Sequence, residues 1–582
     1  MKTSLQLPAL ALLSLLAACG GGGGASGAAG LLPGAARYGF DGLDVSETIV
    51  AGSHGEAPGS DLLLGGMLVS AAAGGAETLL YQTHLDALGR PEAAHQVSFP
   101  MDLANFALET WSLEHRGAHS AFVSGLHVWG AGRSSDGGWC ALFDEANPAL
   151  ILDSVLFVDG GIGTLLYWFD PGSGEGRLAY EEFGPDGSVI LAAELPGTVQ
   201  SPDVCSMGLV RSPDGTEWPV IAGAQAANLV TWIGVVDRVH AEVSITLTTT
   251  VSPTEVTAIQ VVDAPNADSA WVLATRYLSG TPVVEAVQVR TTELDGVPIG
   301  GTPIVAFANT VSFLVASGYR GLECRTALHG AEVGPDSANT LLLAGVTEDM
   351  ASSERRAVWV AWEGGEVNAS WTTVVEGVST PSLLGLQLAT SPRAGRIAVS
   401  ANVVSPTGEA TAVVGELDIE TGALVDGSYY DTAFLVHELQ ATEKGLLLHR
   451  QEMLGTALEI EAVREDLTCE FSVSLVDGAG DTILEPDALQ RAYSDRGLVA
   501  GGSDQGLYVI DLLDPLARAD ASSVVSDLPP ASGPEAAVFG SSLFVVGIQN
   551  GMSDQGIELL VPAGPRLVPQ VVTPLGITAS GL

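Results

Sequence analysis

Short apolar runs separated by polar turns recur along most of the chain. Residues 341–345, 357–362 and 412–417 are typical, because each is rich in Val, Leu, Ala or Trp and is followed by a polar segment. Runs of this length, bounded by turn residues, predict β-strands. Turns such as Pro185-Asp186-Gly187 contain a glycine, which adopts the positive φ that a tight reversal requires. The pattern predicts an all-β protein.

The turns recur with a long period. The second turn of each unit falls at Asp86, Asp144, Asp186, Asp237, Asp295, Glu363, Asp418, Glu465, Asp511 and Ala563. The mean step between them is about 53 residues, a period that indicates repeated supersecondary units.

This order of strand, glycine, acidic turn and strand resembles the degenerate β-propeller repeats of bacterial exported proteins, over most of residues 60–565. The resemblance implies four-stranded blades that bury both faces of each sheet, which explains why the strands read as apolar runs. No WD dipeptide or kelch double glycine recurs at a fixed phase. We expect a β-propeller of roughly 7–10 units.

Several architectures remain open at this point. Ten units exceed the usual four to eight blades, so some units are not full blades, the ring is unusually large, or there are two rings. An array of β-sandwiches is the competing architecture. Residues 102–115 also carry a helix-like spacing of apolar side chains, at Leu103, Phe106 and Trp111, which predicts an interruption of the first repeat.

The first residues have the pattern of an export signal. Lys2 precedes an apolar run at residues 7–16, which is too short for a transmembrane helix of about 20 residues. Residues 16–19, Leu-Ala-Ala-Cys, resemble the bacterial lipobox. The resemblance implies cleavage between Ala18 and Cys19 and attachment of a diacylglycerol to the Cys19 thiol. An ordinary signal peptide with a chance cysteine is the alternative.

The chain is therefore predicted to have three parts. Residues 1–18 form the signal peptide, residues 19–40 contain the lipidated cysteine and a glycine-rich flexible tether, and residues 41–582 form the repeat domain. Gly20 is not the aspartate that is associated with inner-membrane retention in enteric bacteria. By this resemblance the lipid anchor would hold the protein in the cell envelope, at the outer membrane of a Gram-negative bacterium.

The charge excludes one class of partner. The chain has 69 acidic and 23 basic residues, for a net charge of −46, and the acidic residues are scattered along its length. Such a surface repels nucleic acids, so we expect no DNA or RNA partner. The charge suits either a high-salt environment or calcium at the cell surface.

Four cysteines remain after the anchor, at Cys140, Cys205, Cys324 and Cys469. An exported protein folds under oxidising conditions, and four cysteines allow two disulfides in three possible connectivities. Pairing in sequence order would join Cys140 to Cys205 and Cys324 to Cys469. Four unpaired thiols are the alternative. The absence of a CxxC motif removes support for a zinc or thioredoxin-like site.

No stretch of the sequence specifies a reaction. On a helix, His115 and His119 would share a face, with Glu114 adjoining them, but the segment lacks the HExxH arrangement of zinc proteases. The acidic segments 170–175 and 477–481 lack the alternating oxygen ligands of a calcium loop, so we interpret them as turns. No nucleophile elbow, P-loop or dinucleotide fingerprint occurs in its required context. We assign no catalytic residue, metal site or cofactor.

The leading hypothesis is a non-catalytic lipoprotein of the cell envelope that binds a protein or glycan partner. A purely structural scaffold without a small ligand is closely related to it. The alternative is an extracellular polysaccharide hydrolase or lyase with its site in the propeller channel, since propellers host such sites.

Overall fold

The computed structural model describes residues 34–580 except for many of the segments that connect strands, the longest being 53–61, 100–110, 475–490 and 512–530. Side chains are described within residues 114–468. Strands make up nearly all of the described residues, and the helical turns among them are the short 3-10 helices η2 (Gly330–Glu332) and η3 (Pro335–Ser337). The predicted all-β fold is confirmed.

The described strands form ten sheets, which we call blades and number around the ring. In sheet order, blade 1 contains β37 (Ala531–Phe539), β38 (Ser542–Gln549), β39 (Ile557–Val561), β1 (Gly34–Gly39) and β40 (Gln570–Pro574), and blade 2 contains β2 (Leu43–Gly52), β3 (Leu62–Ser70), β4 (Glu77–Leu85), β5 (Pro91–Phe99) and β41 (Ile577–Ser580). Blade 3 contains β6 (Trp111–Arg116), β7 (His119–Ser124), β8 (His127–Gly132) and β9 (Trp139–Leu142), and blade 4 contains β10 (Leu150–Leu156), β11 (Ile162–Asp170), β12 (Glu175–Phe183) and β13 (Val189–Val199). Blade 5 contains β14 (Cys205–Arg211), β15 (Glu217–Gln225), β16 (Val230–Asp237) and β17 (Glu242–Thr248).

Blade 6 contains β18 (Val256–Val262), β19 (Ser269–Leu278), β20 (Thr281–Arg290) and β21 (Ile304–Thr310), and blade 7 contains β22 (Tyr319–His329), β23 (Thr340–Asp349), β24 (Arg355–Glu363) and β25 (Trp371–Val374). Blade 8 contains β26 (Gln387–Thr390), β27 (Arg396–Val404), β28 (Ala410–Asp418) and β29 (Leu424–Asp431), and blade 9 contains β30 (Phe434–Thr442), β31 (Gly445–Glu452), β32 (Leu458–Arg464) and β33 (Cys469–Ser474). Blade 10 contains β34 (Arg491–Tyr493), β35 (Leu498–Ser503) and β36 (Gly506–Asp511).

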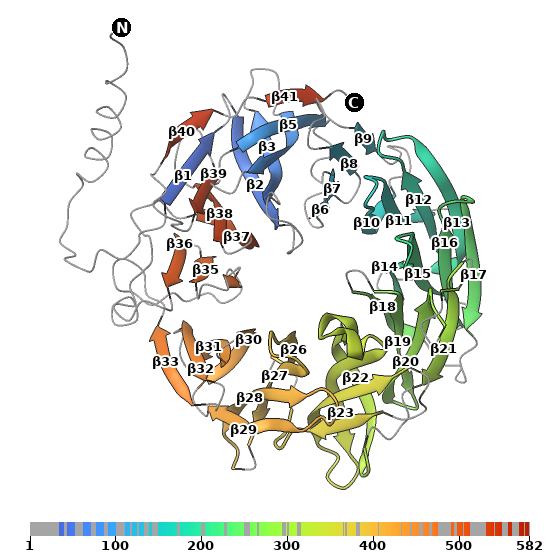
Figure 1. Cartoon of the computed structure of the whole chain (residues 1–582), viewed down its shortest axis with the longest axis vertical. Helices are drawn as coiled ribbons and strands as arrows, with labels where there is room; N and C mark the ends of the chain where they lie inside the picture. Colours follow the sequence, from blue (N-terminus) through green and yellow to red (C-terminus); the bar gives the residue numbers. More distant parts are fainter. Residues whose placement is uncertain are drawn as a thin grey trace, which may run out of the picture.

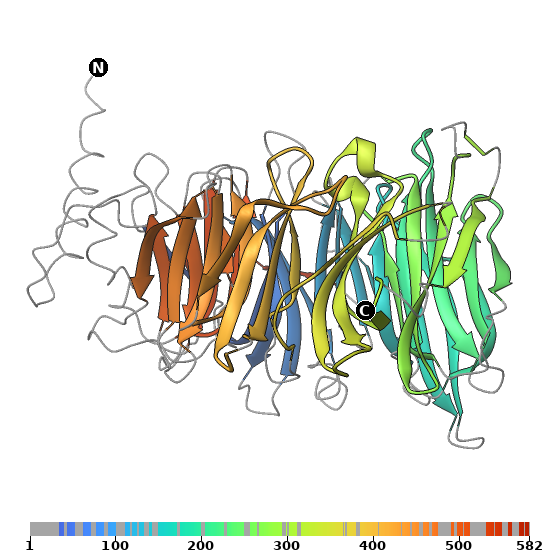
Figure 2. The same ribbon diagram turned by 90° about the horizontal axis from the view of Figure 1, so that it is seen from below.

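The blades follow one another around a single ring in sequence order (Figure 1). The first strand of each of blades 2 to 9 lies nearest the centre (Figure 1), and in the side view the strands run across the thickness of the ring (Figure 2). The fold is a β-propeller. Of the architectures left open by the sequence, the single large ring is the one observed, in place of two rings or an array of sandwiches.

Nine of the ten predicted turn residues are the last residue of a blade's third strand or follow that strand in the sequence. Asp237, Glu363 and Asp418, for example, each end the third strand of a blade. Asp144 is the exception, because it follows β9, the fourth strand of its blade. The predicted spacing is irregular around Asp144 because this residue follows the fourth strand of its blade, whereas the blades themselves repeat regularly.

The ring closes through a strand that the sequence analysis placed in the tether. β1 pairs antiparallel with β39 and parallel with β40, with Ala36 opposite Leu559. The predicted boundary at residue 40 is therefore wrong, because the tether would end before Gly34. The sequence Gly-Ala-Ala-Arg-Tyr-Gly has little strand character of its own, and its partners lie more than 500 residues away in the chain.

The helix-like spacing at residues 102–115 is also corrected in part. Trp111 and His115 lie in strand β6, which pairs with β7 in an antiparallel hairpin. Residues 102–110 lie outside the described residues. The neighbouring hairpin partner stabilises an extended conformation that the local spacing did not indicate.

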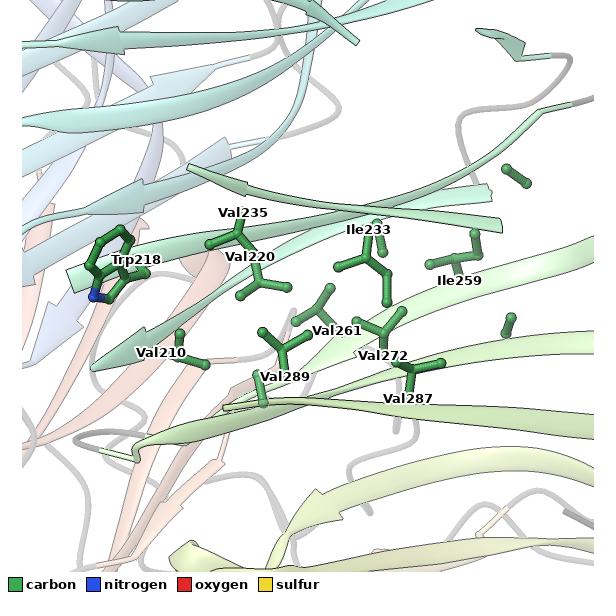
Figure 3. Packing of buried hydrophobic residues seen from close by; sticks show 14 of the residues in the cluster. Val210, Trp218, Val220, Ile233, Val235, Ile259, Val261, Val272, Val287 and Val289 are labelled. Atoms are coloured by element: carbon green, nitrogen blue, oxygen red, sulfur yellow. The ribbon is translucent and has the colours of Figure 1, made fainter. Parts of the chain in front are cut away.

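The core consists of the seams between neighbouring blades. In β23, Leu341 and Leu343 pack toward blade 6, whereas Leu342 and Ala344 pack toward blade 8. Figure 3 shows one seam, in which Val220 and Val235 of blade 5 face Val272 and other residues of blade 6. Both faces of a described sheet are thus buried, which explains the uninterrupted apolar runs.

Candidate functional site

The inner strands expose backbone groups that need partners. An inner strand has a neighbouring strand on one side only, so alternate N–H groups along its free edge are unpaired within the sheet. Polar side chains from the adjacent blade accept hydrogen bonds from several of these groups. We call these side chains the inner collar; they are Glu114, Asp153, Ser206, Asp263 and Asn402.

Glu114 connects blade 3 to blade 4. Its Oε2 accepts a hydrogen bond from the Leu156 backbone N–H at 2.8 Å, and its Oε1 accepts one from the Ser154 hydroxyl at 3.2 Å. Asp153 repeats the arrangement one blade later, because its Oδ2 accepts from the Met207 N–H at 3.0 Å. Its Oδ1 accepts from the Ser154 N–H at 2.9 Å. Both oxygens of each carboxyl are therefore already hydrogen-bonded.

Further around the ring, other side chains accept hydrogen bonds from the backbone N–H groups of the inner strands. Asp263 of blade 6 accepts from the Leu209 N–H of blade 5 at 2.6 Å. Asn402 of blade 8 accepts from the Val436 N–H at 3.0 Å and donates to the Val436 carbonyl at 2.9 Å. An amide can satisfy a donor and an acceptor on one inner strand, whereas a carboxylate satisfies donors only.

Burial shifts the acidity of the collar carboxyls. It raises the pKa of Glu114 to about 7 and that of Asp153 to about 6, although backbone hydrogen bonds act in the opposite direction. Burial also raises the pKa of Asp263, and burial together with the negative charge of Asp263 raises the pKa of Glu332 in η2. Asp153 and Asp263 further raise the pKa of Glu114, so these carboxyls interact electrostatically.

A second polar cluster joins three blades at Glu217, whose side chain is 5% exposed. Glu217 Oε1 lies 2.7 Å from a guanidinium nitrogen of Arg116 in blade 3 and 2.7 Å from one of Arg211 in its own blade 5. Its Oε2 accepts a hydrogen bond from the Val158 N–H of blade 4 at 2.9 Å. We call Glu217 with Arg116 and Arg211 the three-blade cluster.

Arg238 makes a similar connection between blades 4 and 5. Its Nε donates to Glu182 at 2.7 Å, and its guanidinium lies 3.6 Å from the centre of the Phe157 ring. The Tyr180 hydroxyl donates to the other oxygen of Glu182 at 2.9 Å. Glu182 therefore has a structural role, as the partner of Arg238 in an ion pair between blades.

The structure corrects the predicted disulfides. Neither Cys205 nor Cys324 forms a disulfide, so both pairings in sequence order are absent. Cys205 lies on the inner strand of blade 5, whereas Cys140 lies on the outermost strand of blade 3. Cys324 and Cys469 are likewise on the inner strand of blade 7 and the outermost strand of blade 9. Burial raises the pKa of the Cys324 thiol to about 12, so it is unreactive at neutral pH.

The other predicted features fall outside the described residues or in plain strands. Ala18 and Cys19 lie outside the described residues, as does the segment 477–481. His115 and His119 are on paired strands, not on one helix face. Among the described residues, no three His, Cys, Asp or Glu side chains are placed to hold a metal ion. The part of the chain that the structure describes contains no helix with the length and apolarity of a membrane span.

Asp153 and Asp263 were missed from the sequence, although a signal is present. Each interrupts or directly follows an apolar strand, in Leu-Ile-Leu-Asp and Val-Val-Asp. A charged residue at such a place must find partners when it is buried. What the sequence could not supply is the partner, since it lies about one blade away.

Comparisons with known proteins add little. No family model matches the sequence, and no curated protein is similar to it. Among solved structures, the chain is similar to the Dos1 propeller (9% identity, TM-score 0.34), covering 67% of this chain and 89% of that chain. The WD40 domain of SCAP from fission yeast has 8% identity and a TM-score of 0.31, over 71% and 93% of the two chains. A eukaryotic initiation factor has 11% identity and a TM-score of 0.38, over 78% and 96%. At these scores nothing about function is carried over.

Proposed function

We propose that the chain is a lipid-anchored, non-catalytic scaffold of the cell envelope, at the outer membrane of a Gram-negative bacterium, that presents its ring to a protein or glycan partner. The lipobox-like residues 16–19 and the glycines that follow support the anchor. The proposal that the chain is non-catalytic rests on Glu114, whose carboxyl group is fully engaged in hydrogen bonds. Both of its oxygens accept hydrogen bonds from blade 4, which gives it a structural task.

The anchor is tested by Cys19→Ser in the full-length chain, expressed in a Gram-negative host. The wild-type protein is expected in the membrane fraction with an acylated amino terminus, whereas the variant remains unprocessed and carries no acyl chain. An inhibitor of the lipoprotein signal peptidase should reproduce the unprocessed precursor. Normal processing of the variant, or an unacylated wild-type amino terminus, would refute the anchor.

A second function is favoured by one specific observation. Glu114 and Asp153 lie on adjacent inner strands, and burial raises the pKa of the two carboxyls to about 7 and about 6. Carboxyls with such values suit general acid and base catalysis near neutral pH. The alternative is therefore a polysaccharide hydrolase or lyase whose acids are the collar carboxyls.

One comparison separates the two functions. The purified protein and its Glu114→Gln variant are incubated with neutral and uronic-acid polysaccharides, and new reducing ends and unsaturated uronates are measured. Binding of the same glycans and of envelope proteins is measured in parallel. The scaffold predicts binding without product formation in either protein. Turnover by the wild type that is lost in the variant would establish the enzyme instead.

A further inference from the structure

The seam between blades 6 and 7 has a polar end. On β20, Val287 and Val289 pack toward blade 5, so the alternate residues Gln288 and Arg290 face blade 7. Both side chains are buried, with exposures of 0% for Gln288 and 3% for Arg290. Arg290 Nη2 donates to Asn339 Oδ1 of blade 7 at 2.6 Å.

Most of the hydrogen-bonding capacity of these two side chains is unused. Arg290 Nε and Nη1 have no partner, and neither do the amide nitrogen and oxygen of Gln288. A buried polar group without a partner destabilises the folded state, and a buried charge without one does so more strongly. Arg290 and Gln288 together therefore offer three unsatisfied donor atoms in one seam.

Arg290 differs from the other buried arginines of the described residues. Arg276, on the neighbouring strand, lies 2.8 Å from Glu285, and Arg450 lies 2.6 Å from Glu461. No carboxylate among the described residues lies within ion-pair distance of Arg290. In a chain with a net charge of −46, this guanidinium is a buried cation that forms no ion pair with a described acid.

None of the neighbouring described side chains forms an ion pair with Arg290. Ala331 N–H donates to His329 Nδ1 at 3.1 Å, so the ring proton is on Nε2, which lies 3.3 Å from the Ser269 hydroxyl. Burial lowers the pKa of His329 to about 4, so it is neutral near pH 7. Asp268, the nearby acid, accepts a hydrogen bond from Thr292.

Gly364 allows the Gln288 side chain to approach the blade 7 backbone closely. A Cβ at this position would lie 2.5 Å from Gln288 Oε1, so any other residue would displace the Gln288 side chain. The Gly364 N–H donates to the Asn339 carbonyl at 2.9 Å, which joins the two blade 7 residues that face Gln288 and Arg290.

We propose that this seam is a binding site for one small oxyanion, of the phosphate or carboxylate class, held by Arg290 and Gln288. The anion neutralises the buried guanidinium and accepts hydrogen bonds from its unused N–H groups and from the Gln288 amide. Its size is limited because both side chains are enclosed between blades. The site is independent of the scaffold function and of the inner collar.

The test titrates the full-length protein with potassium phosphate, and separately with acetate, while chloride keeps the ionic strength constant. Thermal unfolding is followed by tryptophan fluorescence, and heats of binding are measured directly. We expect a saturable rise in Tm of about 2 °C or more with one of the two anions, which identifies the class. Arg290→Met keeps the aliphatic stem and should abolish the rise.

Two further variants make the result decisive. Gln288→Glu places a carboxylate beside Arg290, so it should raise Tm without added anion and remove the response to it. Arg320→Met changes an exposed arginine of blade 7 that pairs with Glu348, and it should respond like the wild type. The proposal is overturned if the wild type shows no saturable response, or if the response persists in Arg290→Met or in Gln288→Glu.

Discussion

Single buried acids connect the blades of this ring. Glu217 is the clearest case, because one carboxylate meets two arginines and a backbone N–H that together come from three blades. Such a group is costly to leave unpaired inside a protein, so the blades are held at the spacing that satisfies it. The three-blade cluster thus contributes to how neighbouring blades are positioned, in addition to apolar packing.

Glu217→Ala is expected to destabilise the protein by about 2–3 kcal/mol, because it removes the buried acceptor that two guanidinium groups and the Val158 N–H share. Glu217→Gln retains an acceptor and should cost less. The midpoint of urea unfolding, followed by tryptophan fluorescence, measures both.

The matched control is Glu348→Ala, which removes the partner of exposed Arg320 and should cost at most about 1 kcal/mol. A loss in Glu217→Ala no larger than the loss in this control would show that the three-blade cluster does not stabilise the ring.

The collar carboxyls predict a specific dependence of stability on pH. Because burial raises the pKa of Glu114 to about 7 from its ordinary 4.5, the folded state binds more protons than the unfolded state between these values. Stability therefore falls as pH rises through this window, by up to about 3 kcal/mol from this group. Asp153, with a pKa of about 6, acts in the same direction.

Tm measured from pH 4.5 to pH 8 tests this dependence. Glu114→Gln keeps an acceptor for Leu156 and carries no charge, so it should be more stable than the wild type at pH 8 and similar at pH 4.5. Glu420→Gln, at an exposed turn, should follow the wild-type curve. Parallel curves for the wild type and Glu114→Gln would contradict the assigned role of burial.

At the scale of elements, the strands were predictable and their partners only in part. Asp237, Glu363 and Asp418 were correctly placed at the ends of third strands. They could be predicted because a turn between antiparallel strands depends on residues that are close together in the sequence. β1 was missed because its strand character comes from β39 and β40 at the other end of the chain. The inner collar was missed for the same reason, since each of its acids accepts a hydrogen bond from a neighbouring blade.

Ring closure can be tested through β1. Ala36→Pro removes a backbone N–H from a strand that lies between two others and should destabilise the sheet by about 3 kcal/mol or more. Limited proteolysis is expected to cleave near β37–β40 much faster than in the wild type. Ala36→Ser should behave like the wild type, and equal protease resistance of the proline variant would mean that β1 does not close the ring.

At the scale of the whole molecule, the structure is one ring in which the first strand, β1, shares a sheet with β37–β40, and the last strand, β41, joins the sheet of β2–β5. Blades 4 to 8 pack apolar residues on both faces, and the inner strands of blades 4, 5, 6 and 9 are hydrogen-bonded by polar side chains of a neighbouring blade. This arrangement leaves the outer and turn surfaces available for contact with a partner. A scaffold held by lipid at one end would present those surfaces away from the membrane.

The most direct test of this account is electron cryomicroscopy of the purified chain viewed along the ring axis. The account predicts one closed ring with ten radial sheets, and density for a strand from the amino-terminal region beside the last sheets of the chain. Two smaller rings, or an open arc in which that strand is absent from the closing sheet, would contradict it.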